Sequence, residues 1–209
     1  MGREIFAMVR IRVFSYQALP PKERLEAILG APVAAFLSQG RRGTALQETL
    51  TGFCLLSQML PEIPLESVHK TEKGRPFLAG FPNLDFSITH CSGFVACALE
   101  DGDAPKVGLD AECLGTQTER SMRLVAHRWF TPSEQADFEA SFGEENFLSI
   151  WTAKEAAAKF TGNGLDRFSA PNLAEMECRH YHVGDVILCA VCRKGIRLPD
   201  ELEFAEPIE

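Results

Sequence analysis

Hydrophobic and polar residues follow two spacings along this chain, and each spacing predicts a different kind of element. Alternating character predicts β-strands, because successive side chains of a strand point to opposite faces. Hydrophobic residues three and four positions apart predict helices with one buried face. The predicted strands are Met8–Tyr16, Asp85–His90, Phe94–Leu99, Lys106–Glu112, Arg167–Pro171 and Tyr181–Cys192. The predicted helices are Pro21–Leu29, Gly43–Leu60, Ser121–Phe130, Pro132–Phe142 and Glu144–Thr161.

Local signals and element order sharpen this assignment. Thr131 is a suitable N-cap before Pro132, and Gly162 follows the last predicted helix as a C-terminal signal. In each half of the chain a strand precedes a long helix, which is consistent with two similar α+β lobes joined at a turn over 101–105.

Composition limits the class of protein. At 209 residues, with 45% hydrophobic and 24% charged residues, the chain suits one domain or two small lobes that share a core. No apolar run approaches the ~20 residues of a membrane span. The charged N-terminus resembles no signal peptide, so a cytoplasmic protein without membrane contact is expected.

Charge is distributed unevenly. The net charge is −8, yet residues 1–75 carry ten Lys/Arg and seven Asp/Glu. Anion binding is therefore expected in the basic first third, whereas the overall acidity argues against nucleic acid as a partner. The last ten residues contain five acids and no base, which predicts a solvated tail.

The seven cysteines lie mostly in apolar segments, which predicts reduced, buried thiols. Cys189 and Cys192, with Cys178, His180 and His182 upstream, raise the hypothesis of a zinc site. In a strand, positions three apart point to opposite faces, so Cys189 and Cys192 cannot readily share a metal. The pattern favours a buried strand.

Two carboxylates share one face of the predicted strand Lys106–Glu112. Asp110 and Glu112 alternate with apolar residues, so their backbones lie roughly 7 Å apart on the same side. This arrangement suits a hard divalent cation, and oxygen ligands favour Mg²⁺ over zinc. The alternative is a polar strand face exposed to solvent.

A third carboxylate lies on the helix Glu144–Thr161. Glu155 follows Phe147 and Trp151 at helical spacing, so it lies on or beside the buried stripe, where an unpaired charge is costly. Lys154 and Lys159 flank it, as in a site for a metal and a phosphate. The alternative is an amphipathic helix with a Glu155–Lys159 surface pair.

Further candidates lie in the middle of the chain. His90 ends an apolar strand face and is either a core residue or a functional one, while Thr89 points the other way and offers a hydroxyl to a phosphate. The turn around Gly74 places Lys73 and Arg75 where backbone can approach a ligand. Arg41 and Arg42, before the helix Gly43–Leu60, are a weaker indication of anion binding.

Four motifs in order carry a resemblance to a known family. They are Lys73-Gly74-Arg75-Pro76, Phe86-Ser87-Ile88-Thr89-His90, Gly108-Leu109-Asp110-Ala111-Glu112 and Trp151-Thr152-Ala153-Lys154-Glu155-Ala156-Ala157-Ala158-Lys159. The chain resembles the 4′-phosphopantetheinyl transferase superfamily, in particular its single-chain surfactin-synthetase-activating type. The resemblance implies an α+β fold of two pseudo-symmetric α/β lobes, 1–103 and 104–209, each with a small antiparallel sheet packed on a long helix. The site would lie between the lobes.

The resemblance also implies an activity: Mg²⁺-dependent transfer of the 4′-phosphopantetheine arm of coenzyme A to a serine of an apo acyl or peptidyl carrier protein, releasing 3′,5′-ADP. The implied metal ligands are Asp110, Glu112 and Glu155. The implied coenzyme A-binding residues are Lys73, Arg75, Thr89, His90, Lys154 and Lys159. The implied catalytic residues are Glu155, as the base, with His90 and Lys159.

Two positions depart from the family pattern: Cys91 follows the histidine where serine is usual, and Arg75 stands where lysine is frequent. The alternative function is a homologue that binds coenzyme A or the carrier without turnover. A two-lobed chain can build such a site alone, so a monomer is expected.

Overall fold

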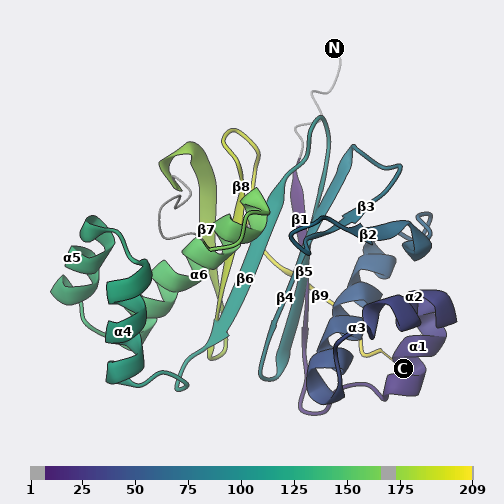
Figure 1. Cartoon of the computed structure of the whole chain (residues 1–209), viewed down its shortest axis with the longest axis horizontal. Coiled ribbons are helices and arrows are strands. Elements are labelled where there is room, and N and C mark those ends of the chain that lie inside the picture. Colours follow the sequence, from purple (N-terminus) through teal and green to yellow (C-terminus); the bar gives the residue numbers. More distant parts are fainter. Residues whose placement is uncertain (1–7, 166–172, 209) are drawn as a thin grey trace.

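Two small sheets lie face to face at the centre of the molecule, and helices cover their outer faces (Figure 1). The structure, a computed structural model, describes residues 8–165 and 173–208. The first sheet has the order β4 (Leu84–Cys91), β5 (Phe94–Asp101), β1 (Val9–Ser15), β9 (Glu203–Phe204). The second has the order β6 (Val107–Cys113), β8 (Val186–Arg193), β7 (Met176–Val183). A separate hairpin joins β2 (Val68–Lys70) and β3 (Pro76–Leu78).

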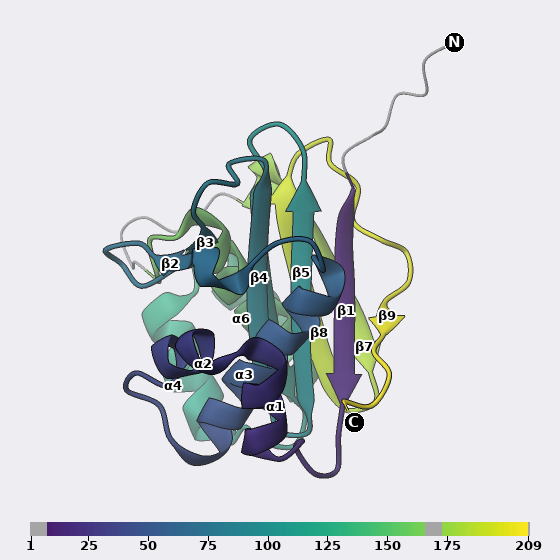
Figure 2. The same cartoon turned by 90° about the vertical axis from the view of Figure 1, so that its right-hand side faces the viewer.

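Helices from each half of the chain cover one sheet. Those of the first half, which lie against the first sheet, are α1 (Lys22–Leu29), α2 (Ala31–Leu37) and α3 (Gly43–Met59) (Figure 2). Those of the second half are α4 (Glu119–Trp129), α5 (Pro132–Ala140) and α6 (Glu144–Thr161). Short 3₁₀ turns span Leu65–Ser67 and Leu173–Glu175. No helix among the described residues is long and apolar enough to cross a membrane.

The alternation of each strand distributes its side chains between two cores. Val95, Cys97 and Leu99 of β5 pack against the helices of the first half. The intervening residues of β5 face the second sheet, where they meet Val107 and Leu109 of β6. The shared core between the sheets makes the molecule a four-layer α/β/β/α structure.

Side chains of β4 also bond the edge of β6. The backbone N–H groups of Val107, Leu109 and Ala111 donate to Asp85 Oδ2, Ser87 Oγ and Thr89 Oγ1 at 2.8, 3.0 and 3.1 Å. These acceptors alternate along β4, as do the donors along β6. The edge N–H groups of β6 are thus satisfied by side chains instead of by another strand.

Most predicted elements are confirmed with ends shifted by one or two residues, and Glu144–Thr161 matches α6. Thr131 and Gly162 cap their helices as predicted. The prediction of one strand over Tyr181–Cys192 was wrong, because a turn at 184–185 divides β7 from β8. The helix α2 and the strands β2, β3 and β9 were not predicted, and the predicted strand Arg167–Pro171 lies outside the described residues.

The C-terminal segment is solvated in part, as predicted, because its described acidic side chains are exposed, but it also docks on the first sheet. Glu203–Phe204 forms β9, which pairs in parallel with Arg12 and Val13 of β1. Ala205 and Ile208 then pack against the core of the first half. The apolar residues between the acidic ones were overlooked in the sequence, and they contact the first sheet and its core.

Candidate active site

Two neighbouring elements bring three carboxylates together, as the sequence predicted. Asp110 and Glu112 lie two residues apart on β6 and face α6, which carries Glu155. One oxygen from each carboxylate lies within 4.8 Å of the others. Asp110 is only 3% exposed. The acidic cluster of these three residues is therefore set into the interface between β6 and α6.

A glycine permits this close approach of helix and strand. A Cβ atom at Gly108 would lie 1.9 Å from the backbone oxygen of Ala156 and 2.7 Å from the backbone nitrogen of Phe160. No side chain fits at that position without moving the helix backbone. Gly108 thus sets the distance at which Glu155 faces the strand.

The acidic cluster is electrostatically unbalanced without a cation. Burial and the negative charge of Asp110 raise the pKa of Glu155 to about 7, against the opposing effect of Lys159. Burial and Asp110 likewise raise the pKa of Glu112. Asp110 Oδ2 is buried and has no hydrogen-bond partner in the described structure. An orphaned oxygen among three repelling carboxylates is what an oxygen-liganded divalent cation would satisfy.

Lys159 joins this cluster by a contact that the sequence did not predict. Its amine donates to Asp110 Oδ1 at 2.7 Å and to Thr89 Oγ1 at 3.2 Å. The alternative, a helical surface pair of Lys159 with Glu155, is not formed, because the lysine side chain points across to β6 and β4. One positive charge thus offsets part of the repulsion.

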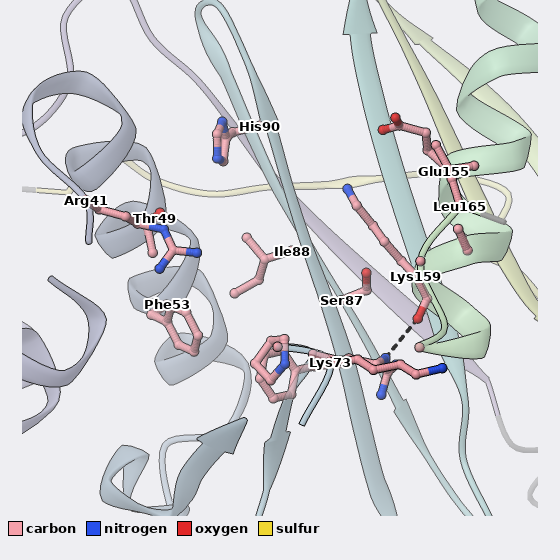
Figure 3. Close-up of a pocket in the computed structure, with 17 residues that line it drawn as sticks. Arg41, Thr49, Phe53, Lys73, Ser87, Ile88, His90, Glu155, Lys159 and Leu165 are labelled. Carbon is pink, nitrogen blue, oxygen red and sulfur yellow. Dashed lines mark hydrogen bonds between the residues drawn. The ribbon is translucent and has the colours of Figure 1, made fainter. Parts of the chain in front are cut away.

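A pocket opens beside the cluster, along the edge of β4 that no strand of the described residues pairs with. Its volume is about 440 Å³, and α3 and α6 lie on opposite sides of it (Figure 3). Glu155 is its acidic lining residue, and Phe53 and Ile88 supply apolar walls. The basic side chains that line it are Arg41, Lys73, Arg75, His90 and Lys159. The pocket is therefore suited to a ligand with several negative charges next to an apolar part.

Arg75 holds the two halves of the chain together at one end of the pocket. Its guanidinium makes a bidentate pair with Asp85 at 2.8 and 2.7 Å, and it donates to the backbone oxygens of Lys159 (2.8 Å) and Val107 (3.0 Å). Asp85 in turn accepts the N–H of Val107. Most donors of Arg75 are thus used internally, so its position in the pocket wall is fixed.

His90 faces the opposite side of β4 from Thr89, toward α3. Its Nδ1 lies 3.2 Å from Glu48 Oε2, and Tyr16 donates to Glu48 Oε1 at 2.8 Å. Burial lowers the pKa of His90, and the charge of Glu48 partly opposes this effect. A ring held by a carboxylate at a pocket wall is oriented to donate to an anion.

The other predicted phosphate-binding residues lie in different surroundings. Lys73 lines the pocket and donates to Asn163 Oδ1 at 2.8 Å. Thr89 is 3% exposed and is occupied by the backbone of Ala111 and the amine of Lys159. Its hydroxyl therefore holds the acidic cluster in place and does not line the pocket.

Lys154 differs most from its predicted position. Its buried amine donates to both oxygens of Glu134 at 3.1 and 2.8 Å, and Glu134 also accepts the backbone N–H of Thr131. Lys154 is not among the pocket-lining residues, so a phosphate contact would require this ion pair to open. In this structure the residue joins α6 to the start of α5.

Three residues near the site were undervalued by sequence reasoning. Arg41 lines the pocket, although its sequence context indicated only a basic turn. Glu48 and Asp85 orient His90 and Arg75 from positions that are distant in sequence. An acidic residue in a predicted buried segment is the signal that would have suggested both pairs, because a buried carboxylate needs a cationic or hydrogen-bonding partner.

Comparisons with known proteins find similar sequences. The family model of the 4′-phosphopantetheinyl transferase superfamily matches residues 106–195, which include the acidic cluster. A 4′-phosphopantetheinyl transferase of Bacillus pumilus is 30% identical over 157 residues, covering 71% of this chain and 62% of the relative. One of Bacillus subtilis is 30% identical over 97 residues (45% and 40%). A putative one of Haemophilus influenzae is 29% identical over 143 residues (66% and 56%). The chain thus spans 40–62% of the length of these curated relatives.

Proposed function

We propose that this chain belongs to the 4′-phosphopantetheinyl transferase superfamily and transfers the 4′-phosphopantetheine arm of coenzyme A to a serine of an apo carrier protein, releasing 3′,5′-ADP. Relatives that bear the name of this activity support the transferase assignment. The observation that carries the proposal is the acidic cluster of Asp110, Glu112 and Glu155 next to a pocket lined by five basic side chains. A divalent cation and a polyanionic substrate would complement these two features.

The three carboxylates fit Mg²⁺ by their chemistry, since all ligands are oxygens and one buried oxygen has no partner. When bound, Mg²⁺ would offset the negative charge of the pyrophosphate. Lys159 brings its amine to the boundary between cluster and pocket, where it can bind the leaving phosphate group. Phosphoryl transfer depends on such positioning and charge compensation more than on covalent steps by the protein.

Glu155 is the proposed base. It belongs to the cluster and also lines the pocket, so a serine hydroxyl entering the pocket can donate its proton to a Glu155 oxygen. With Mg²⁺ bound beside it, the pKa of Glu155 would fall from its raised value, so the carboxylate would be ionised and able to accept the proton. His90, held by Glu48, and Lys73 would bind phosphate oxygens from the other walls.

Three further parts of the proposal concern organisation. The two halves, each with a long helix packed on a small sheet, are proposed to be pseudo-symmetric lobes with the site between them. The proposed active form is a monomer, because two lobes of one chain can build the site. The partners are coenzyme A and an acyl or peptidyl carrier protein, and the surfactin-synthetase-activating type is the proposed subtype.

Mass spectrometry of apo acyl and peptidyl carrier proteins incubated with the chain, coenzyme A and Mg²⁺ tests this function. A mass gain equal to one phosphopantetheine arm is expected. Glu155→Gln and Asp110→Asn should abolish the gain, while Glu66→Gln, at an exposed site, should leave it unchanged. Absence of transfer across all carriers would refute the function, and coenzyme A binding without transfer in calorimetry would identify a non-catalytic homologue.

A further inference from the structure

A second group of potential metal ligands lies outside the pocket, on the sheet face that α6 covers. Cys178 and His180 of β7 and Cys189 of β8 place one ligand atom each within 4.8 Å of one another. The two sulfurs are 3.4 Å apart. Cys189 is fully buried and Cys178 is exposed, so the thiol–imidazole cluster of these three residues has a closed base and an open side.

The β7–β8 hairpin creates this cluster. In the register of the hairpin, His180 is paired with Cys189 and Cys178 is paired with Val191. The two cysteines are therefore diagonal neighbours on adjacent strands. The sequence-based objection to zinc concerned Cys189 with Cys192, and those side chains do lie in different cores. The proximity of Cys178 to Cys189 was not predicted, because Cys178 lies before the single strand predicted over Tyr181–Cys192.

The histidine is oriented from outside the cluster. His180 Nε2 lies 2.8 Å from the backbone oxygen of Ser149 on α6, in hydrogen-bonding position. Ligating histidines commonly use one nitrogen for such a bond, which fixes the ring while the other nitrogen holds the metal. The orientation of the third ligand is therefore set by α6, the helix that carries Glu155.

The sulfur geometry favours a metal over a disulfide. Diagonal positions on antiparallel strands have Cα atoms about 7–8 Å apart, whereas disulfides need about 4.4–6.8 Å. Two sulfurs that bind one tetrahedral ion at about 2.3 Å lie roughly 3.8 Å apart. The observed 3.4 Å reaches that separation by small side-chain rotations.

We propose that Cys178, His180 and Cys189 bind one zinc-class divalent cation. Two thiolates and one imidazole are soft and borderline ligands, which select zinc over the Mg²⁺ that suits the carboxylates. Three protein ligands leave one tetrahedral position for water at the exposed side. The cation would tie the β7–β8 hairpin together next to α6, and this role is independent of the transferase proposal.

Cobalt substitution tests the site without any activity measurement. The full chain, reduced and stripped of metal, is titrated with Co²⁺, and thiolate-to-cobalt charge-transfer absorption is recorded. One equivalent should give the band, and excess Zn²⁺ should remove it. Carboxylate ligands give no such band, so Co²⁺ in the acidic cluster does not interfere.

Matched variants identify the ligands. Cys178→Ser and His180→Ala should each weaken cobalt affinity more than about tenfold. His182→Ala, one position further along the same face of β7, and Cys113→Ser, a thiol elsewhere, should leave it unchanged. Because Cys178 is exposed, Cys178→Ser is the variant that should disturb folding least. A reduced protein without the band, or an equal band in Cys178→Ser, overturns the proposal.

Discussion

Replacing Glu155 by glutamine should stabilise the metal-free protein, although it removes a proposed catalytic group. In the fold this carboxyl has a pKa of about 7, against an ordinary value of 4.5. Below pH 4.5 the carboxyl is protonated in the folded and unfolded states alike. Between pH 4.5 and 7 only the folded state holds the proton, so folding stability falls as pH rises.

The size of the effect follows from the pKa. One pKa unit corresponds to about 1.4 kcal/mol, so the ionised carboxylate would cost roughly 3 kcal/mol at pH 8 as an upper bound. Glu155 retains some contact with solvent, which screens the repulsion, and about 1–2 kcal/mol is the expected cost. Glu155→Gln should gain this amount relative to the natural chain at pH 8, and most of the gain should vanish by pH 5.

Urea unfolding in EDTA at pH 5 and pH 8 measures the difference, with Glu66→Gln as the exposed control. Saturating Mg²⁺ should reverse the order at pH 8, because it stabilises only a fold that binds it, by about 2.7 kcal/mol at a concentration 100 times the Kd. The reasoning is wrong if the natural chain and Glu155→Gln lose stability in parallel between pH 5 and 8.

Three other perturbations probe the surroundings of the site. Gly108→Ala should destabilise the fold by about 3 kcal/mol or more in urea unfolding, because its Cβ would overlap the backbone of α6, and an unchanged stability would contradict this close packing. Arg75→Lys should lower the free energy of unfolding by about 1–3 kcal/mol, because lysine cannot form the bidentate pair with Asp85. Unchanged stability would contradict the role of Arg75 in holding the two halves together. Glu48→Gln should lower the pKa of His90 further in an NMR titration, since the Glu48 charge opposes the lowering; a higher pKa would refute that pairing.

Sequence patterns predicted the parts of the fold that depend on local rules. Strand alternation placed Asp110 and Glu112 on one face, and helical spacing placed Glu155 at the buried edge of α6. Caps at Thr131 and Gly162 marked helix ends because capping depends on a few adjacent residues.

Ion pairs between residues far apart in the sequence could not be predicted from local patterns. Lys154 and Lys159 are both close to Glu155 in sequence, yet the first pairs with Glu134 and the second with Asp110. Which carboxylate a lysine meets depends on how α6 packs, and sequence spacing alone cannot distinguish the two. The hairpin turn at 184–185 is a different case, because Gly184-Asp185 between two strand-like segments is a local turn signal that was overlooked.

The bonds from β4 side chains to the edge of β6 have a consequence for motion. The turn over 101–105 was a natural place for a hinge, yet opening there would break all three bonds from Asp85, Ser87 and Thr89 and expose the core between the sheets. We therefore expect the pocket to keep its shape when substrates enter, because opening at this turn would be costly. The same bonds hold β6 in register, since a slip of one residue would turn its two carboxylates into the apolar core. The same three bonds thus limit motion between the sheets and keep Asp110 and Glu112 on the face of β6 that meets α6.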